Sequence, residues 1–337
     1  MKLLTVIVPC FNSQDYMHNC IDSLLPGGSE LEIILVNDGS TDNTSDIAND
    51  YAQRYPKQIQ AIHQANAGHG GAINAGLAVG TGEYIKIVDS DDWVDEQSLR
   101  QIMTQLRTFT PNHRPDVLIS NYVYEKVGKR RKTAMRYTNV FPQGELVTWE
   151  QTRPFRLGQY MMMHALMYRR DILAKSALSL PTHTFYVDSL YAYVPLAQCE
   201  TLYYMNVDFY RYFIGRQDQS VQEKTMIRRV DQHLRVTLAM IQGLQLLGVA
   251  PRKKRDYLAR YLEITLAISS VLLVKADSAE SLAKKTQLWQ HLHDQDKWLY
   301  QHLRYKLLGR LLHPRTRMGR YGGLIVYKVA QWIVGFN

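Results

Sequence analysis

The sequence contains little cysteine and no long hydrophobic run. Its three cysteines, Cys10, Cys20 and Cys199, include no Cys-x-x-Cys pair, so neither a disulfide framework nor a structural zinc site is expected. So few cysteines are typical of a reducing compartment. The closest candidate for a membrane span, residues 264–274, is shorter than the roughly 18 residues needed and includes three hydroxyl side chains. The first eight residues are too short and too poor in basic residues for a signal peptide, and we expect a cytoplasmic protein.

Acidic residues are scarce in the last third of the chain. Residues 1–220 contain 20 Lys and Arg against 23 Asp and Glu, a net charge of −3. Residues 221–337 contain 20 against 8, a net charge of +12. The length of 337 residues, of which 46% are hydrophobic, suffices for one large domain or two smaller ones. The charge split predicts two domains, 1–220 and 221–337, of which the second binds an anionic surface.

Short hydrophobic runs alternate with helical patterns in the first hundred residues. Four strands are expected, with a helix between each pair, and repeated βαβ units of this kind predict a mostly parallel sheet with helices on both faces. Beyond residue 221 only helical spacing remains, so the expected fold is an α/β domain followed by an all-helical region. The expected strands are 3–8, 31–36, 58–63, 83–88, 117–124, 161–168 and 201–212, and the expected helices are 13–25, 42–55, 70–79, 188–197, 224–247, 251–274, 278–292 and 295–312.

Three carboxylates directly follow an expected buried strand. Asp89, Asp91 and Asp92 come after residues 83–88, and open α/β sheets bind ligands at the carboxyl ends of their strands. Carboxylates this close raise each other's pKa unless a cation lies among them. Oxygen ligands suit Mg²⁺ or Mn²⁺. One Asp would be enough to cap the helix that begins near Asp95, so the run favours a metal site.

Polar or glycine-rich segments follow the other three early strands. They are Pro9–Asn12, Asn37–Asp42 and Asn66–Gly71, and all three lie at the same edge of a parallel sheet. The glycines of the last segment allow the backbone to approach a ligand at a helix N-terminus. Taken singly, each segment is an ordinary turn, and the glycines lack the Gly-Lys-Ser/Thr ending of a P-loop. Their position beside the acidic run predicts one ligand-binding crevice.

In their order along the chain, these motifs resemble those of the family 2 glycosyltransferases. The resemblance is dense up to about residue 100 and loose up to about residue 220. It implies the GT-A fold and inverting transfer of a sugar, hexosyl or N-acetylhexosaminyl, from a nucleotide sugar, usually a UDP-sugar. The acceptor implied is a hydroxyl of a glycan or of a lipid-linked precursor in bacterial cell-surface or cell-wall polysaccharide synthesis. The matching segments are Val6–Asn12, Val36–Asp42, Asn66-x-Gly68, Asn74-x-Gly76 and Gly82–Asp92.

The resemblance also implies a role for each matching residue. Asp38 binds the base, Asp89 faces the ribose or sugar, and Asp91 reaches a Mn²⁺ or Mg²⁺ ion that grips the diphosphate. Asp92 assists at the metal or supports its loop. Trp93 and His164 are candidates to shape the acceptor pocket, although aromatic residues in such places often only pack. The remaining donor-binding residues are Pro9, Phe11, Asn12, Asn66 and Gly68.

Two departures from the family pattern matter for catalysis. Asp188 stands where the family has its general base, but Val187 replaces the Glu that often precedes it; the alternative for Asp188 is a helix N-cap. Relatives often carry Ala-Arg-Asn where this chain has residues 72–74, Ala-Ile-Asn. Another cation must then meet the diphosphate. The candidates are His69, Arg211 and Arg216, of which Arg211 has the alternative of pairing with a nearby carboxylate.

The last forty residues carry no acid. Residues 297–337 contain eight Lys or Arg with Trp and Leu interleaved, which is typical of helices lying in a membrane interface. Anionic lipids add about 1 kcal/mol per basic residue near the surface. The alternative is a helical bundle with a solvated basic face. No nucleic-acid motif is present, so nucleic acid is not an expected partner, and a peripheral location at the inner face of the cell membrane is expected.

Two alternative functions predict different motifs. A sugar nucleotidyltransferase predicts a glycine-rich loop with a basic residue after the first strand, which Pro9–Asn12 lacks. A non-catalytic glycan- or membrane-binding protein on the same fold predicts loss of the acidic run, which is intact. The donor sugar, the acceptor, the linkage and the oligomeric state are left open by the sequence.

Overall fold

The computed structural model describes residues 1–128, 132–156, 158–215, 223–243 and 250–305. The chain divides into two compact units. The first consists of Met1–Pro154 with Met161–Gln219, and the second of Phe155–Tyr160 with Ser220–Asn337. The domain bounds 1–220 and 221–337 stay a prediction.

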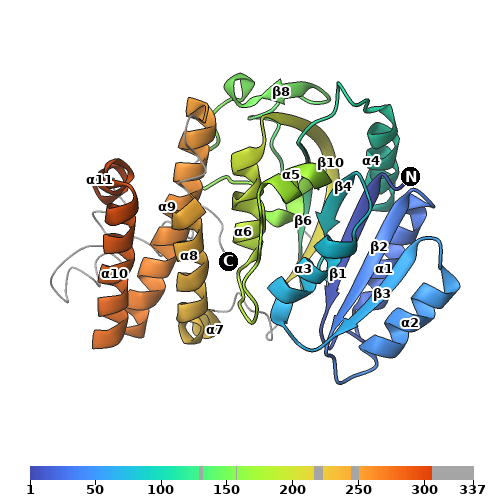
Figure 1. The fold of residues 1–337 in the computed structure, drawn as a ribbon, viewed down its shortest axis with the longest axis horizontal. Helices are drawn as coiled ribbons and strands as arrows, with labels where there is room; N and C mark the ends of the chain where they lie inside the picture. The colour runs from blue at the N-terminus through green and yellow to red at the C-terminus, as the bar shows by residue number, and fades with distance from the viewer. Residues whose placement is uncertain (129–131, 157, 216–222, 244–249, 306–337) are drawn as a thin grey trace. The chain divides into compact units, whose positions relative to one another are not determined.

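The first unit is built on one ten-stranded sheet in the order β3-β2-β1-β4-β9-β6-β10-β5 (Figure 1). The strands β3, β2, β1 and β4 are parallel to one another, as the βαβ pattern predicts. The strands β1, β2 and β4 are buried because their side chains are almost all apolar. The strands of this half are β1 (Leu4–Cys10), β2 (Leu31–Asp38), β3 (Ile59–Gln64), β4 (Tyr84–Ile87) and the short β5 (Trp93–Val94).

Helices alternate with these strands. Helix α3 lies close to β1, since a Cβ on Gly76 would be only 2.3 Å from Cγ2 of Ile7. Helix α4 begins after Asp95, whose side chain accepts a hydrogen bond from the Ser98 N–H as an N-cap. The helices are α1 (Met17–Leu24), α2 (Thr44–Arg54), α3 (Gly68–Val79) and α4 (Glu96–Thr108).

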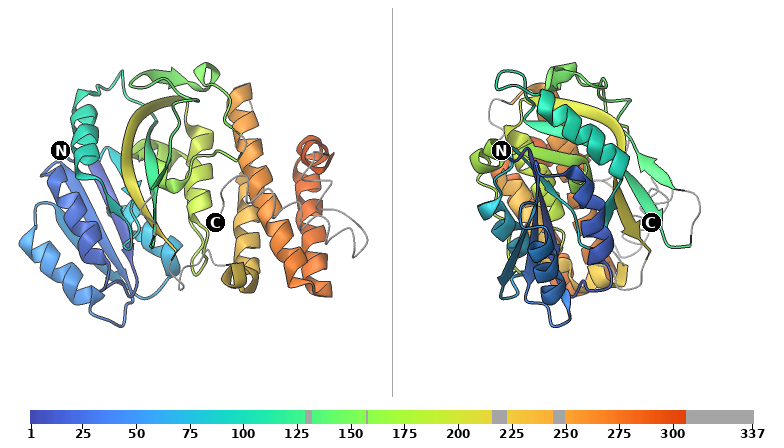
Figure 2. Two further views of the ribbon diagram at one scale, coloured as in Figure 1. Left: turned by 180° about the vertical axis from the view of Figure 1, so that it is seen from behind. Right: turned by 90° about the vertical axis from the view of Figure 1, so that its right-hand side faces the viewer.

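The second half of the sheet mixes strand directions. Strand β9 is antiparallel to both β4 and β6, and β10 is parallel to β6. The strand expected over 201–212 is the long β10, which curves visibly in Figure 2 and has register shifts around Asp208. Strand β7 pairs with β6, and β8 with β10. These strands are β6 (Val117–Lys126), β7 (Thr133–Met135), β8 (Leu146–Thr148), β9 (Leu166–Arg169) and β10 (Thr201–Ile214).

Among the expected elements whose bounds differ, two contribute residues to the candidate site. The strand expected over 161–168 begins only at Leu166, because Met163–Ala165 forms the 3₁₀ turn η3. The helix expected over 188–197 is α6 (Asp188–Tyr193) followed by the 3₁₀ helix η4 (Pro195–Gln198). Proline lacks the N–H and its ring clashes with the preceding turn, which explains the end of α6.

The second unit is helical in its described part. Helices α8, α9 and α10 pack against one another, and a buried hydrogen bond of 2.7 Å joins His233 Nδ1 and Ser269 Oγ. By length and composition α9 passes as a membrane span, which the sequence expectation did not allow for; core helices of globular proteins pass the same test, and 72% of its apolar window is buried. The helices are α7 (Glu223–Arg228), α8 (Val230–Gly243), α9 (Arg252–Ala276), α10 (Ala279–Gln295) and α11 (Lys297–Tyr305).

Candidate active site

The acidic loop, residues 89–92, follows β4 directly at the carboxyl edge of the sheet. Asp92 is buried, and both of its carboxylate oxygens accept hydrogen bonds: Tyr210 Oη donates to Oδ2 at 2.6 Å, and the Phe213 N–H donates to Oδ1 at 2.7 Å. Burial and the neighbouring Asp91 and Asp89 raise the pKa of Asp92. These contacts fix the loop against β10. Burial is the larger cause of the raised pKa of Asp92, and the repulsion that the spacing predicts adds to it.

Asp89 of the acidic loop pairs with His69 in the first turn of α3. His69 Nε2 and Asp89 Oδ1 lie 2.9 Å apart. Burial works against protonation of His69, but Asp89, Asp188 and Asp91 outweigh it and raise the histidine pKa. Burial likewise opposes ionisation of Asp89, but His69, together with His164 and Lys86, lowers the carboxyl pKa. His69 therefore supplies positive charge within the acidic cluster.

Asp188 is the first residue of α6 rather than its N-cap. The cap position is Val187, and no side chain caps the helix. Burial raises the pKa of Asp188, His69 lowers it and Asp89 raises it again, for a net increase. A carboxylate with a raised pKa, partly buried beside the acidic loop, has the properties of a general base.

His164 is 3% exposed and lies against two tyrosines of β10. Its ring centroid is 4.6 Å from that of Tyr210 and 4.3 Å from that of Tyr212. Neither ring nitrogen has a hydrogen-bond partner among the described residues. Burial lowers the pKa of His164 to about 3, so the ring is neutral. The role of His164 in an acceptor pocket stays a prediction, and in this structure its side chain is almost fully covered.

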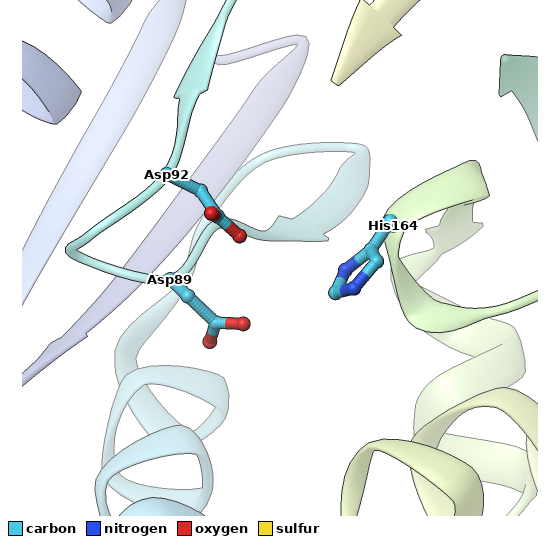
Figure 3. A group of neighbouring side chains, drawn as sticks. All are labelled: Asp89, Asp92 and His164. Atoms are coloured by element: carbon cyan, nitrogen blue, oxygen red, sulfur yellow. The ribbon is translucent and has the colours of Figure 1, made fainter. Parts of the chain in front are cut away.

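Figure 3 shows the carboxylates of Asp89 and Asp92 facing the ring of His164. One ligand atom from each of the three side chains lies within 4.8 Å of the others. Two carboxylates and a neutral imidazole form a donor set that first-row divalent cations accept. The residues present therefore fit a divalent metal ion.

Lys86 is a buried group that the motifs in the sequence do not reveal. It lies in the otherwise apolar β4, and its Nζ donates to the carbonyl oxygens of Met163, at 2.9 Å, and His164, at 2.6 Å. Burial lowers the pKa of Lys86 well below its usual range, against the attraction of Asp89 and Asp92. The contacts hold η3, and with it the backbone of His164, in place. A lysine inside a buried strand was the available signal.

Asp38 ends β2, which lies on the other side of β1 from β4. Its Oδ1 accepts hydrogen bonds from Gln64 Nε2 at 2.7 Å and from the Ala67 N–H at 2.8 Å. Asn66 Nδ2 donates to the Asp38 carbonyl oxygen at 2.9 Å. No described residue donates to Oδ2 of Asp38, so one carboxylate oxygen stays available at a rigid position.

The loop after β1 is tied to its neighbours by polar contacts. Asn12 adopts a positive φ of 48°, and its Oδ1 accepts a hydrogen bond from the Thr41 N–H at 2.9 Å. Phe11 is 52% exposed, and Pro9 is buried within β1. Ser13, which belongs to none of the predicted site residues, joins this loop to the acidic loop through a 2.8 Å contact with Ser90 Oγ.

The glycine-rich segment is crossed by a strap formed by residues 180–183. The His183 N–H donates to the Ala67 carbonyl oxygen at 2.7 Å. Gly68 has a φ of +77°, and a Cβ there would be 2.9 Å from backbone atoms of His183. The Asn74 side chain binds both the N–H and the carbonyl of Leu180. These contacts fix the N-terminus of α3 at the crevice.

Two other predicted residues, Arg211 and Trp93, have different surroundings. Arg211 pairs with Asp95 at 3.1 Å and with Glu125 at 3.2 Å, which is the alternative that the sequence left open. Trp93 in β5 packs against Phe213, with ring centroids 5.9 Å apart. Arg216 lies outside the described residues.

Comparisons with known proteins agree with this arrangement. The family model described as "Glycosyl transferase family 2" matches residues 5–174. An uncharacterized glycosyltransferase, YibD of Escherichia coli, is 45% identical over 102 residues, which are 30% of this chain and 29% of that protein. A poly(ribitol-phosphate) beta-glucosyltransferase of Bacillus spizizenii is 28% identical over 184 residues, which are 53% of this chain and 27% of that protein. The chain thus spans less than a third of the length of these two relatives.

A solved structure extends the likeness to the whole fold. The crystal structure of residues 1–349 of S. aureus TarS has a TM-score of 0.65 to this chain at 19% identity. The match covers 99% of this chain and 92% of that structure. At this identity it establishes the shared GT-A type fold: a curled, mostly parallel sheet followed by helices. The family match covers half of the chain, and the chain belongs to glycosyl transferase family 2.

Proposed function

We propose that this protein is an inverting glycosyltransferase that moves a sugar from a UDP-sugar to a hydroxyl of a glycan or a lipid-linked glycan precursor. The observation that carries the proposal is the gathering of Asp89, His69 and Asp188 at one edge of the sheet, opposite Asp38. TarS, which has the same fold, has been crystallised with UDP-GlcNAc and with UDP. This supports a UDP-sugar as the donor, of the hexosyl or N-acetylhexosaminyl class.

The donor nucleotide is held at the ends of β1 and β2. Oδ2 of Asp38 accepts a hydrogen bond from the base, while Oδ1 is occupied by Gln64 and Ala67. The exposed ring of Phe11, between Pro9 and Asn12, gives the base an apolar surface to pack on. Asn66 and Gly68 bring backbone close to the donor at the N-terminus of α3.

The diphosphate is held at the acidic loop. A bound Mn²⁺ or Mg²⁺ supplies positive charge that offsets the charge growing on the leaving nucleoside diphosphate. Asp89, Asp91 and Asp92 would hold the ion, and Asp92 also keeps the loop in place through Tyr210 and Phe213. His69 adds a second positive charge in place of the arginine that relatives carry. Arg216 stays a candidate for the same task.

Asp188 acts as the general base. Its carboxylate takes the proton from the acceptor hydroxyl as that hydroxyl attacks the anomeric carbon from the face opposite the leaving group, so the configuration inverts. Its raised pKa makes it a stronger base than an ordinary aspartate. Trp93, half-buried at the rim of β5, stays a candidate for acceptor contact.

The proposal is tested by a donor screen. UDP-, GDP- and dTDP-sugars are compared for hydrolysis and for thermal stabilisation of the protein, each in Mn²⁺ and in EDTA. We expect a UDP-sugar to raise the melting temperature in Mn²⁺, since a ligand at 100 times its Kd stabilises the folded state by about 2.7 kcal/mol. A chain that no nucleotide sugar stabilises or reacts with is not the proposed enzyme.

A further inference from the structure

We propose that His164 is a nitrogen ligand of the divalent ion at the acidic loop, in a site that it completes with the carboxylates of Asp89 and Asp92. The proposal deepens the proposed function, because it assigns a ligand to the metal that the enzyme needs. It adds a side chain from η3, about seventy residues away in sequence, to a loop that otherwise offers only oxygen.

The first argument is the state of the imidazole. A buried histidine almost always hydrogen-bonds through at least one ring nitrogen, yet neither nitrogen of His164 has a partner among the described residues. The ring faces the two carboxylates in Figure 3.

The second argument is rigidity. The ring is stacked at an interplanar angle of 17° on Tyr210, whose hydroxyl donates to Asp92. Lys86 holds the backbone of His164 through its carbonyl oxygen. The imidazole and one of its two partner carboxylates are thus set by the same strand, as ligands of a preorganised metal site must be. The three ligand atoms lie within 4.8 Å of one another. The side chains must therefore move slightly toward one another when they bind one ion.

A nitrogen ligand changes which metal is preferred. Carboxylate sites suit Mg²⁺, whereas imidazole shifts preference toward Mn²⁺ and later first-row ions. The full-length protein should therefore hold Mn²⁺ more tightly than Mg²⁺, without any nucleotide. Replacing the imidazole by a benzene ring in His164→Phe keeps the stacking on Tyr210 but removes both nitrogens. It should weaken Mn²⁺ binding at least about tenfold. Loss of a residue that only hydrogen-bonds to a metal ligand already weakens metal binding about 10–100-fold.

The deciding measurement is pulsed electron paramagnetic resonance of the protein loaded with MnCl₂. The wild type should show ¹⁴N modulation from a directly bound imidazole, and His164→Phe should lose it. Tyr122→Phe is the matched control: it removes a hydroxyl from a ring that also contacts His164 and offers the metal no ligand. It should leave both the modulation and the Mn²⁺ affinity unchanged.

Three results would overturn the inference. Absence of ¹⁴N modulation in the wild type does so without any variant, which covers the case that His164→Phe fails to fold. Modulation that persists in His164→Phe and vanishes in His69→Gln assigns the nitrogen to His69. A wild type that binds no Mn²⁺ removes the metal from the proposed function as well. In the first two cases the wild type still transfers a sugar from a UDP-sugar, so failure of this inference is distinguishable from failure of the proposed function.

Discussion

Asp188 lies near His69, which lowers its pKa, and near Asp89, which raises it. Burial has the largest effect on the pKa of Asp188 and raises it. Its raised pKa suits a group that must take a proton from a hydroxyl, since basicity rises with pKa. His69 and Asp89 form an ion pair next to it. The titration of the three groups is therefore linked, and any apparent pKa of the reaction belongs to the cluster.

Replacing the base should separate binding from turnover. Asp188→Asn keeps the shape of the side chain and should leave UDP-sugar affinity near the wild-type value. It should lower turnover by about 10² or more, because a positioned base contributes roughly 10²–10⁴-fold. Steady-state kinetics and calorimetry measure the two effects. Asp50→Asn, an exposed carboxylate on α2, is the control and should change neither. Near-normal turnover in Asp188→Asn would place the base elsewhere.

The pH dependence of turnover follows from the raised pKa of Asp188. Asp188 is active only when ionised, so the rate should fall as the pH drops through its raised pKa. The acid limb of the kcat profile should therefore lie above 3.8, the ordinary value for Asp. A profile measured between pH 4 and 8 with donor and acceptor saturating checks this. A rate that stays constant down to pH 4 would contradict it.

At the scale of elements, the candidate site is formed by the segments at the carboxyl ends of the parallel strands. The loop after β1, the turn after β2, the N-terminus of α3 and the acidic loop meet because parallel strands end at one edge. The strap 180–183 and β10 come from the second half of the unit and close the crevice from other directions.

Gly68 is the element-scale test of this arrangement. Gly68→Ala places an alanine in the left-handed backbone conformation, which lowers the stability of the fold by about 1–2 kcal/mol. It also adds a Cβ that would lie 2.9 Å from the His183 backbone. Gly128→Ala is the matched control, since Gly128 has a φ of +71° with no atom near its Cβ. Thermal denaturation should show the larger loss for Gly68→Ala, together with weaker UDP binding. Equal losses in both variants would mean that the strap does not depend on Gly68.

The sequence predicts the first hundred residues well, because each strand end there carries its own polar motif and βαβ topology places those ends together. It does not predict the part of the site around His164. Lys86, His164 and Tyr210 come from three distant segments, and no spacing relates them. Their association depends on the antiparallel insertion of β9 and on the turn η3, which read as one continuous strand in the sequence.

At the scale of the whole molecule, charge is divided between a near-neutral first part and a basic second part. We propose that the protein is cytoplasmic and bound peripherally to the inner face of the membrane, where a lipid-linked acceptor would be found. Of the basic segment 297–337 only residues 297–305, the helix α11, are described; residues 306–337 lie outside the described residues. Helix α11 presents Trp298, which is well exposed.

Liposome binding tests the basic segment. Full-length protein should bind anionic vesicles at low salt and release them as salt rises, because screening shortens the reach of its charges. Deleting residues 315–337 should weaken binding while leaving donor hydrolysis largely intact. Neutral phosphatidylcholine vesicles are the control. If the full-length protein ignores anionic vesicles at low salt, residues 297–337 do not bind membrane and serve as a packing or subunit-contact segment.

The central claim, that the acidic loop binds a nucleoside diphosphate through a divalent ion, is tested most directly by calorimetry with UDP. The wild type is titrated in Mn²⁺ and in EDTA, beside Asp91→Ala and the control Asp50→Ala. We predict that EDTA and Asp91→Ala both weaken UDP binding markedly, because the ion or one of its ligands is lost, and that Asp50→Ala binds as the wild type does. UDP affinity that is unchanged by EDTA and by Asp91→Ala would contradict the claim.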